Sequence, residues 1–516
     1  MLVIPDKRKI IINSNENDSI AHFIPHAKTF THKGDNLVAL PYGVDESIVL
    51  RNLGFSVPPP VLSYYDWPAR FAPMEHQKET AAFLTMHKRA LCLNAPGTGK
   101  SISSLWAADF LLQEGVAKKI LIVAPLSTVM VVWGREIAHH MPHRSFVVCT
   151  GNRAKRSQLL ETPGVQYVII NHDGFTTMVD ELRDFDVVIY DEATALKTPG
   201  SIRYKVFSRW VSANQPWLWL LTGTPISQSP VDAWTLARLV DSDKVPKSFT
   251  TFKDMVMKKV TTFKWVPRED ALETCKQVLQ PSIRFSLDEC KDLPDTNYVG
   301  RKTTLTKQQE KAFKEMQDHA VTIFTNGEVV APNAAVVLSK LLQISCGVVY
   351  GTDGPIAIDA EDRYNTLTEL LDEIGDKAII FVPLKGVQLW LRDKLVADGY
   401  DVAMVNGDTN KNDRNQIFSD FQHTDKPRIL LAHPKVAAHG LTLTRAKDII
   451  WFAPIYSLEQ YEQANARIRR LTTVGKTSVW HIYATKFEAE LYRRLKAKKN
   501  TLAEFLNLVR GVNSDE

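Results

Sequence analysis

The sequence has no long apolar stretch, few cysteines and almost no excess of charge of either sign. It contains no run of about 18 apolar residues, so we expect no membrane span and no membrane partner. The N-terminus lacks the basic-then-apolar order of a secretion signal. The five cysteines include no C-x-x-C pair, which argues against a disulfide framework or a zinc ribbon and favours a reducing compartment. We therefore expect a cytoplasmic protein, or a nuclear one if the source is eukaryotic.

The composition is that of an ordinary globular protein, with 44% hydrophobic and 23% charged residues. It excludes a collagen, a coiled-coil rod and a disordered chain. The formal net charge of +5 is too small to indicate a nucleic-acid partner by itself. Residues 467–499, however, hold ten Lys or Arg against two Glu. Such a segment is either a solvated helix face or a surface for phosphate groups.

Short apolar runs alternate with helical stretches in two parts of the chain. The runs are 90–93, 120–124, 165–170, 187–190 and 218–221 in the first part, and 378–382, 402–405, 429–432, 449–452 and 479–483 in the second. This alternation predicts parallel sheets covered by helices on both faces. We therefore expect an α/β protein with two lobes, at 61–244 and 336–499.

The remaining segments are expected to form smaller parts. Residues 1–60 contain a strand-like run and a helix-like segment, which predicts a small α+β module. The proline-rich stretch 57–61 is predicted to be a stiff, extended connector. Residues 245–335 are Lys-rich and mostly helical in pattern, and we interpret them as an insertion and linker. Residues 500–516 are expected to be a C-terminal helix and tail.

A glycine-rich segment, Asn-Ala-Pro-Gly-Thr-Gly-Lys-Ser at 94–101, lies between an apolar run and a helix-like stretch. This context predicts a phosphate loop, in which glycines turn backbone N–H groups toward phosphates and the next helix adds its dipole. Lys100 would neutralise the β- and γ-phosphates of ATP, and the Ser101 hydroxyl would hold Mg²⁺. The predicted ATP-binding residues of this loop are Gly97, Thr98, Gly99, Lys100 and Ser101.

Two carboxylates, Asp191 and Glu192, follow the apolar run 187–190. A strand that ends in Asp-Glu places them at the carboxyl edge of a parallel sheet, where α/β proteins bind ligands. Asp191 would hold Mg²⁺ through water, and Glu192 would orient and deprotonate the attacking water. A polar strand end is the structural alternative, but the position 91 residues after Lys100 favours catalysis.

A further turn follows the run 218–221, and its hydroxyls are expected to sense the γ-phosphate and report it to the other lobe. Its residues are Thr222, Gly223 and Thr224. The order of all these segments resembles helicase superfamily two, and within it the SWI/SNF-like DNA translocases. The matching segments are 121–127 with 133–136, 168–175, 221–226, 379–381, 406–409, 438–443 and 463–470. The resemblance covers roughly residues 70–495 and implies two RecA-like lobes, an ATP hydrolase, and double-stranded or branched DNA as partner.

The resemblance also implies roles for residues outside the first three motifs. Gln463, Arg467 and Arg470 fall in the segment that completes the ATP site. The two arginines are three residues apart, so they would share one helix face and reach the γ-phosphate. Gln77 would read adenine, and a surface glutamine at a helix start is the alternative. Gly440 would help to couple hydrolysis to motion.

Contacts with DNA are expected from loops and helix N-termini that bind phosphates without reading sequence. The candidates are Ser127, Asn171, Gly407, Lys435 and Thr442. Some positions depart from the family pattern: Asn94 replaces a glycine, Thr194 a histidine and Thr442 an asparagine. The insertion between the lobes is short and no accessory module is evident. Nucleosome remodelling is therefore disfavoured, and a compact bacterial or phage-type enzyme fits better.

These observations predict an ATP-dependent translocase that tracks on double-stranded DNA and remodels branched or forked DNA by branch migration or annealing. Such an enzyme would serve DNA repair, recombination or replication. Two alternatives stay open: a helicase that separates DNA or RNA strands, and a slow, nucleotide-switched clamp on DNA. The 1–60 module is expected to target the motor to a DNA structure or a protein partner. We expect a monomer.

Overall fold

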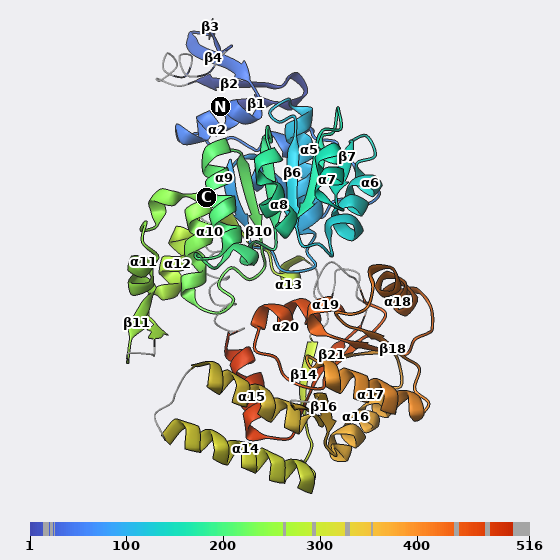
Figure 1. Cartoon of the computed structure of the whole chain (residues 1–516). Coiled ribbons are helices and arrows are strands. Elements are labelled where there is room, and N and C mark those ends of the chain that lie inside the picture. The colour runs from blue at the N-terminus through green and yellow to red at the C-terminus, as the bar shows by residue number, and fades with distance from the viewer. Residues whose placement is uncertain are drawn as a thin grey trace. The chain divides into compact units, whose positions relative to one another are not determined.

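The computed structural model describes residues 1–13, 20, 24, 26–261, 265–290, 296–325, 331–351, 354–437, 443–469 and 475–498. Two compact units divide the chain, one built from Met1–Cys290 and the other from Lys291–Leu502. Each unit contains its own parallel sheet with helices packed on it (Figure 1). Among the helices of the described residues, none combines the length and apolar composition that a bilayer crossing needs. The expected tail at 500–516 lies outside the described residues.

A seven-stranded parallel sheet forms the centre of the first unit, in the order β13-β5-β10-β9-β6-β8-β7. Its strands are β5 (Arg89–Cys92), β6 (Ile120–Ala124), β7 (Phe146–Cys149), β8 (Tyr167–Asn171), β9 (Val187–Asp191), β10 (Trp217–Leu221) and β13 (Ser282–Ile283). All five predicted strands of this lobe are present, because strands buried on both faces read as unbroken apolar runs. The apolar runs do not predict β7 and β13.

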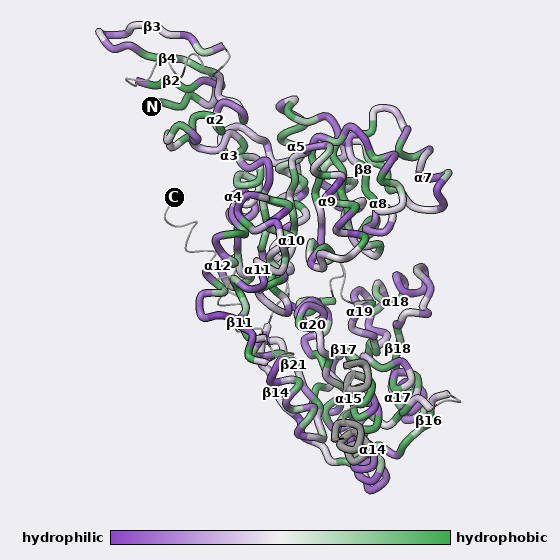
Figure 2. The backbone as a smooth tube through the Cα atoms, turned by 60° about the vertical axis from the view of Figure 1, so that its left-hand side comes forward, coloured by the Kyte–Doolittle hydropathy of each residue, from purple (hydrophilic) through white to green (hydrophobic). Residues whose placement is uncertain are grey.

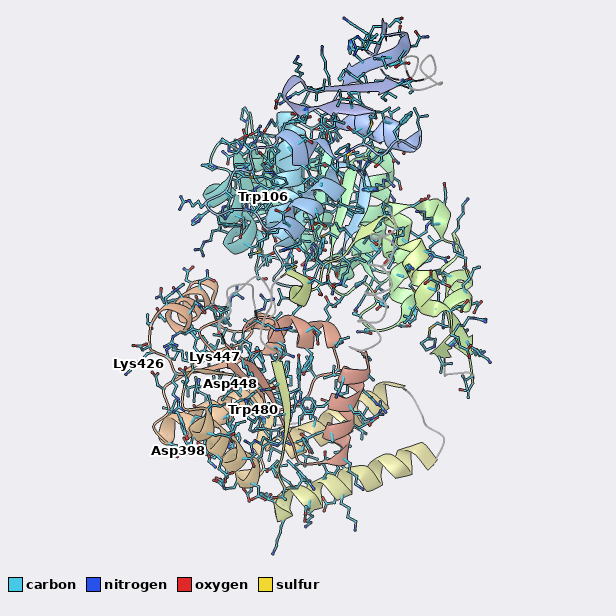
Figure 3. The ribbon with its side chains drawn as sticks, turned by 180° about the vertical axis from the view of Figure 1, so that it is seen from behind. Trp106, Asp398, Lys426, Lys447, Asp448 and Trp480 are labelled. Carbon is cyan, nitrogen blue, oxygen red and sulfur yellow. The ribbon has the colours of Figure 1, made fainter. Side chains whose placement is uncertain are left out.

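The helices around this sheet pack on it or on one another. They are α4 (Glu75–Thr85), α5 (Lys100–Gln113), α6 (Arg135–His140), α7 (Arg153–Leu160), α8 (His172–Met178), α9 (Ile202–Asn214), α10 (Ala233–Val240), α11 (Phe249–Val256), α12 (Ala271–Val278) and α13 (Leu287–Cys290). Large aromatic side chains fill the core between the layers. Trp106 of α5, labelled in Figure 3, is fully buried, as are Trp133 and Trp219.

A six-stranded parallel sheet forms the centre of the second unit, in the order β14-β21-β20-β17-β19-β18. Its strands are β14 (Thr296–Lys302), β17 (Ala378–Phe381), β18 (Val402–Val405), β19 (Ile429–Ala432), β20 (Asp448–Trp451) and β21 (Thr477–Tyr483). Central strand β17 is wholly apolar and buried (Figure 2). The indole of Trp480 donates to Asp448 at 2.8 Å and joins β21 to β20 (Figure 3). The five predicted strands of this lobe are present.

The second unit also contains a small hairpin and its own helices. The hairpin pairs β15 (Val348–Gly351) with β16 (Gly354–Ala357). The helices are α14 (Lys307–Thr325), α15 (Ala331–Ser345), α16 (Glu361–Ile374), α17 (Lys385–Ala397), α18 (Lys411–His423), α19 (Pro434–Ala437) and α20 (Leu458–Asn465).

The segment 245–335 differs from the expected helical insertion, because two of its strands belong to the large sheets. Strand β13 pairs with β5 in the first unit, and β14 pairs with β21 in the second. The same segment forms an antiparallel hairpin of β11 (Met257–Lys259) and β12 (Trp265–Pro267). Strands β11, β12 and β13 have only two or three residues and show no hydrophobic period, and most residues of β14 are exposed, so the sequence pattern does not reveal these strands. The second sheet therefore begins at Thr296, before the predicted lobe boundary at 336.

The N-terminal module is an antiparallel sheet in the order β1-β2-β4-β3, with a helix beside it. Its elements are β1 (Leu2–Ile4), β2 (Lys9–Asn13), β3 (Lys28–His32), β4 (Asp35–Pro41), α2 (Val44–Asn52) and α3 (Pro60–Tyr64). The expected connector 57–61 is interrupted, because Pro60 begins helix α3. Val44 and Val61 lie in the core that contains the parallel sheet, and Arg8 pairs with Glu114 at 3.2 Å. The module is therefore docked on the rest of the first unit.

Candidate active site

The glycine-rich loop joins strand β5 to helix α5 in the first unit. Gly97 and Gly99 have φ values of 90° and 89°, which residues with a side chain rarely adopt. The ammonium of Lys100, the first residue of α5, donates to the carbonyls of Asn94 at 2.9 Å and Ala95 at 3.2 Å. The loop therefore surrounds the ammonium of Lys100. It lies at the N-terminus of α5, which favours anions.

Asn94, where a glycine is usual, connects the loop to two other segments. Its side chain is 1% exposed. Its amide nitrogen donates to the hydroxyl of Thr80 in α4 at 2.8 Å, and its amide oxygen accepts from the backbone N–H of Phe285 at 2.9 Å. The departure from the family pattern is therefore a buried amide whose nitrogen and oxygen are both hydrogen-bonded.

Gln77 of α4 lies against the same loop. Its side-chain oxygen accepts from the N–H of Met74 at 3.1 Å, and its amide nitrogen donates to the carbonyl of Thr98 at 3.3 Å. A Cβ added to Gly99 would lie 2.4 Å from that amide nitrogen. Position 99 therefore requires glycine for its φ and for the close approach of Gln77.

The three motifs predicted in this lobe meet on adjacent strands. Strand β10 pairs with both β5 and β9, so Leu221 lies beside Cys92 on one side and Asp191 on the other. The N–H of Thr222 donates to the carbonyl of Cys92 at 3.0 Å. A Cβ on Gly223 would lie 3.0 Å from the ring of Pro96 in the phosphate loop. The turn 222–224 therefore packs directly on the loop that holds Lys100.

The carboxylate of Asp191 is held by two donors. The indole nitrogen of Trp133 donates to Oδ2 and the backbone N–H of Glu192 donates to Oδ1, both at 3.0 Å. Burial raises the pKa of Asp191, while the Trp133 hydrogen bond and the positive charge of Lys100 act in the opposite direction. Glu192 follows with a φ of 52°, a strained conformation of the kind found at functional sites.

Two residues support Asp191 although the sequence assigned them no role. Trp133 and His172 both fall within segments that carry the family resemblance. His172 stacks on the ring of Tyr190 with centroids 4.9 Å apart, and its Nε2 lies 2.9 Å from the carbonyl oxygen of Asp191. Sequence spacing could not pair them with Asp191, because the contacts depend on the order of the strands in the sheet.

The candidate DNA-contacting residues lie at the carboxyl edges of the sheets. In the first unit, half-buried Ser127 follows β6 and buried Asn171 ends the neighbouring strand β8. In the second unit, exposed Gly407 follows β18 and exposed Lys435 follows the neighbouring strand β19. Each pair therefore lies on adjacent strands of its own unit. Thr442 lies outside the described residues.

The arginine motif of the second unit differs from its expected helical form. Helix α20 contains Gln463 but ends at Asn465, so Arg467 lies in the turn beyond it. The expectation of one helix face for Arg467 and Arg470 is therefore wrong for Arg467. Its side chain is 3% exposed, and its Nε donates to the carbonyl of Gln463 at 2.9 Å. Arg470 and the coupling candidate Gly440 lie outside the described residues.

Family models match most of the chain. The SNF2-related domain matches residues 76–346, and the helicase conserved C-terminal domain matches residues 362–472. Among solved structures, the SWI2/SNF2 ATPase core of Sulfolobus solfataricus in complex with dsDNA is 19% identical, with a TM-score of 0.42. That alignment covers 85% of this chain and 94% of the other.

Curated relatives are similar over about three quarters of this chain. Protein p41 of Acyrthosiphon pisum secondary endosymbiont phage 1 is 25% identical, over 77% of this chain and 88% of its own length. An uncharacterized ATP-dependent helicase of Mycoplasma genitalium and the ISWI chromatin-remodeling complex ATPase ISW1 of Saccharomyces cerevisiae are each 23% identical. The matches cover 77% of this chain but only 38% and 37% of those longer proteins. The chain belongs to the SNF2-related family and is an ATP hydrolase of the helicase type.

Proposed function

We propose that the chain is an ATP-driven motor that tracks on double-stranded DNA and remodels branched or forked DNA. One observation carries the proposal: the phosphate loop, the Asp191–Glu192 pair and the turn 222–224 meet on three neighbouring strands. This arrangement suits an enzyme that hydrolyses the terminal phosphate of ATP. The turn 222–224 would detect that phosphate and transmit its presence to the rest of the protein. The names of relatives, which describe a helicase and a chromatin-remodeling ATPase, support coupling of that hydrolysis to DNA.

In this proposal, side chains and backbone of the first unit bind and orient ATP. The N–H groups of 97–99 and the N-terminus of α5 hold phosphate oxygens, and Lys100 exchanges its carbonyl partners for the β- and γ-phosphates. Glu192 accepts the proton of the water that attacks the γ-phosphorus. Arg467 and Arg470 are the residues that the family resemblance assigns to stabilising the charge on that phosphate.

Asp191 and Ser101 offer the hard oxygen ligands that Mg²⁺ prefers. Both oxygens of the Asp191 carboxylate accept hydrogen bonds, which fix its orientation. Ser101 is the second residue of α5 and is half-buried. The residues therefore fit a magnesium ion, and Mg²⁺, when bound, would neutralise charge that develops on the phosphates.

DNA is proposed to bind at the loops that follow neighbouring strands in each unit. Ser127 and Asn171 serve in the first unit, and Gly407, Lys435 and Thr442 serve in the second. Their contacts would be to phosphates, which carry no sequence information and therefore suit a motor that moves along DNA. The turn 222–224, together with Gly440, would couple these contacts to the state of the nucleotide.

The test of the proposal is steady-state ATP turnover with single-stranded DNA, duplex DNA, a four-way junction or RNA. We expect the strongest stimulation by duplex or junction DNA, and a loss of stimulation as salt rises. Stimulation mainly by single strands or RNA would favour a strand-separating helicase. Slow turnover that no nucleic acid stimulates would favour a nucleotide-switched clamp.

Substitutions test the catalytic roles separately. Lys100→Ala and Glu192→Gln are expected to abolish turnover while DNA binding survives. Glu161→Gln makes the same chemical change at an exposed position after α7 and should retain turnover. Wild-type turnover in a clean Glu192→Gln preparation would contradict the catalytic role of Glu192.

The N-terminal module is proposed to direct the motor to a DNA structure or a protein partner. Its strand β3 is exposed along its whole length. Truncation at residue 60 would remove Val44 from the core of the unit, so charge reversal of Lys28 and Lys33 is the cleaner test. A changed preference between junction and duplex DNA would support targeting to a DNA structure, and an unchanged preference would contradict it.

A further inference from the structure

The β11–β12 hairpin and the helix α11 before it form a basic part of the first unit. Residues 249–267, which make up these elements, contain four Lys and one Asp, so they have a formal charge of +3. Lys258 and Lys259 of β11 are exposed. Neither lysine pairs with a carboxylate in the part of the chain that the structure describes. The hairpin therefore presents uncompensated positive charge.

The indole ring of Trp265 contacts one of the nearby lysines. Trp265 of β12 lies directly opposite Lys259 in the antiparallel register, so the two side chains share one face of the ribbon. The ammonium of Lys253, from α11, lies 3.8 Å from the centre of the Trp265 ring. This cation–π contact holds Lys253 against the ring of Trp265, the residue paired with Lys259. Lys258 points to the opposite face, because side chains alternate along a strand.

The base of the hairpin is anchored on the segment that follows the turn 222–224. The hydroxyl of Ser229 donates to the sulfur of Met257, the first residue of β11, at 3.6 Å. The thiol of Cys275 in α12 donates to the carbonyl of Pro230 at 3.3 Å. Ser229 and Pro230 follow the turn 222–224 by a few residues. The lysines of β11 thus project from a fixed base rather than from a free loop.

We propose that the β11–β12 hairpin is an additional DNA-binding surface of the first unit, where Lys253, Lys258 and Lys259 contact phosphates of the duplex backbone. The inference rests on the proposed function, because it assigns a second surface to the same DNA partner. Lysines without carboxylate partners bind phosphates at little electrostatic cost and release counterions as they do so. The hairpin lies within the span 76–346 that the SNF2-related domain matches, but between the motif segments 221–226 and 379–381, and it is separate in sequence from the loops after β6 and β8.

The experiment measures binding of the full chain to a fluorescent duplex over a salt series from about 50 to 200 mM. We expect Lys258→Glu/Lys259→Glu to weaken binding at low salt by about tenfold or more. The slope of log affinity against log salt should become shallower by about 2, because each lost phosphate contact changes it by ~0.9. Lys258→Arg/Lys259→Arg keeps the charge and should bind as the wild type does.

A matched control makes the same change in net charge elsewhere in the unit. Lys205 and Arg209 are exposed on α9, and Lys205→Glu/Arg209→Glu should leave the affinity within about twofold of wild type. Thermal unfolding checks that each variant folds. Equal losses in both charge-reversed variants would show an effect of net charge alone and would overturn the inference.

The binding experiment distinguishes a failure of the hairpin inference from a failure of the proposed function. If the wild type binds DNA and Lys258→Glu/Lys259→Glu binds with the same affinity and salt slope, the hairpin is not a contact and the proposed function stands. If the wild type does not bind DNA at any salt concentration, the proposed function fails and the hairpin inference fails with it.

Discussion

The indole nitrogen of Trp133 donates a hydrogen bond to Oδ2 of Asp191 across 3.0 Å. Trp133 lies on the π-helical turn Val129–Gly134 after β6, and Asp191 ends β9, the strand paired with β6. π-Helical turns are frequent at functional sites. Trp133 is completely buried, and the other carboxylate oxygen is held by the N–H of Glu192. Trp133 is therefore a positioning residue for the proposed magnesium ligand.

Trp133→Phe is expected to raise the Mg²⁺ concentration needed for half-maximal ATP turnover by about tenfold. A hydrogen bond to a charged group contributes ~1.5–3 kcal/mol, and its loss frees the carboxylate to rotate. The measurement is ATP turnover over a magnesium series. Trp106→Phe is the matched control, because Trp106 is equally buried and its indole donates to the carbonyl of Pro68 at 2.9 Å.

The control Trp106→Phe should lower the unfolding temperature without changing the Mg²⁺ concentration needed for half-maximal ATP turnover. An identical magnesium dependence in Trp133→Phe and the wild type would contradict the positioning role of Trp133.

Gln77→Ala is expected to lower kcat/KM for ATP far more than for GTP. The Gln77 amide lies against the phosphate loop, bonded to Met74 and Thr98, where it can exchange these partners for adenine. A bidentate amide contact to adenine discriminates against another base by about 1–3 kcal/mol. Turnover of both nucleotides by wild type and variant is the measurement. Equal losses for ATP and GTP would show that Gln77 only supports the loop.

Much of the architecture could be predicted from sequence, because the central strands are apolar runs and glycine, lysine and carboxylate residues follow them directly. Strand β13 could not be predicted because it has only two residues. Strand β14 could not be predicted because most of its residues are exposed, so it contains no apolar run. Contacts within the site between residues far apart in sequence could not be predicted either. Sequence identified Asn94 as a departure, but its bonds to Thr80 and Phe285 depend on segments 14 and 191 positions away.

Arg363→Met is expected to destabilise the second unit by about 3–5 kcal/mol. Arg363 of α16 and Glu488 are both fully buried, with a nitrogen–oxygen distance of 2.5 Å. Removing one partner leaves an uncompensated buried charge, which costs far more than the pair contributes. Denaturant unfolding of the full chain measures the loss.

The double variant Arg363→Met/Glu488→Gln should recover most of the lost stability, because both charges are then absent while the amide oxygen can still accept from the N–H groups of Ala484 and Thr485. Arg493→Met serves as the control, since Arg493 pairs with Glu490 at an exposed site and should change stability far less than Arg363→Met does. A double variant as unstable as Arg363→Met would show that the penalty does not come from the unpaired carboxylate.

The stability of the second unit is expected to fall as the pH drops from about 6.5 toward 4. Burial lowers the pKa of His481 to about 4, and its Nε2 lies 2.8 Å from the hydroxyl of Tyr461. The unfolded chain, in which the pKa is near 6.5, binds the proton first, so acid favours unfolding. The loss from this histidine should reach ~2 kcal/mol between pH 7 and 5, at ~1.4 kcal/mol per pH unit.

Urea unfolding of the full chain at both pH values measures this loss. His481→Gln keeps a hydrogen-bonding partner for Tyr461 but cannot titrate, so its stability should fall less than that of the wild type over the same interval. His423→Gln, at an exposed helix end, should keep the wild-type dependence. The same pH dependence in His481→Gln and the wild type would mean that acid acts on the second unit through other groups, because only the buried histidine differs between them.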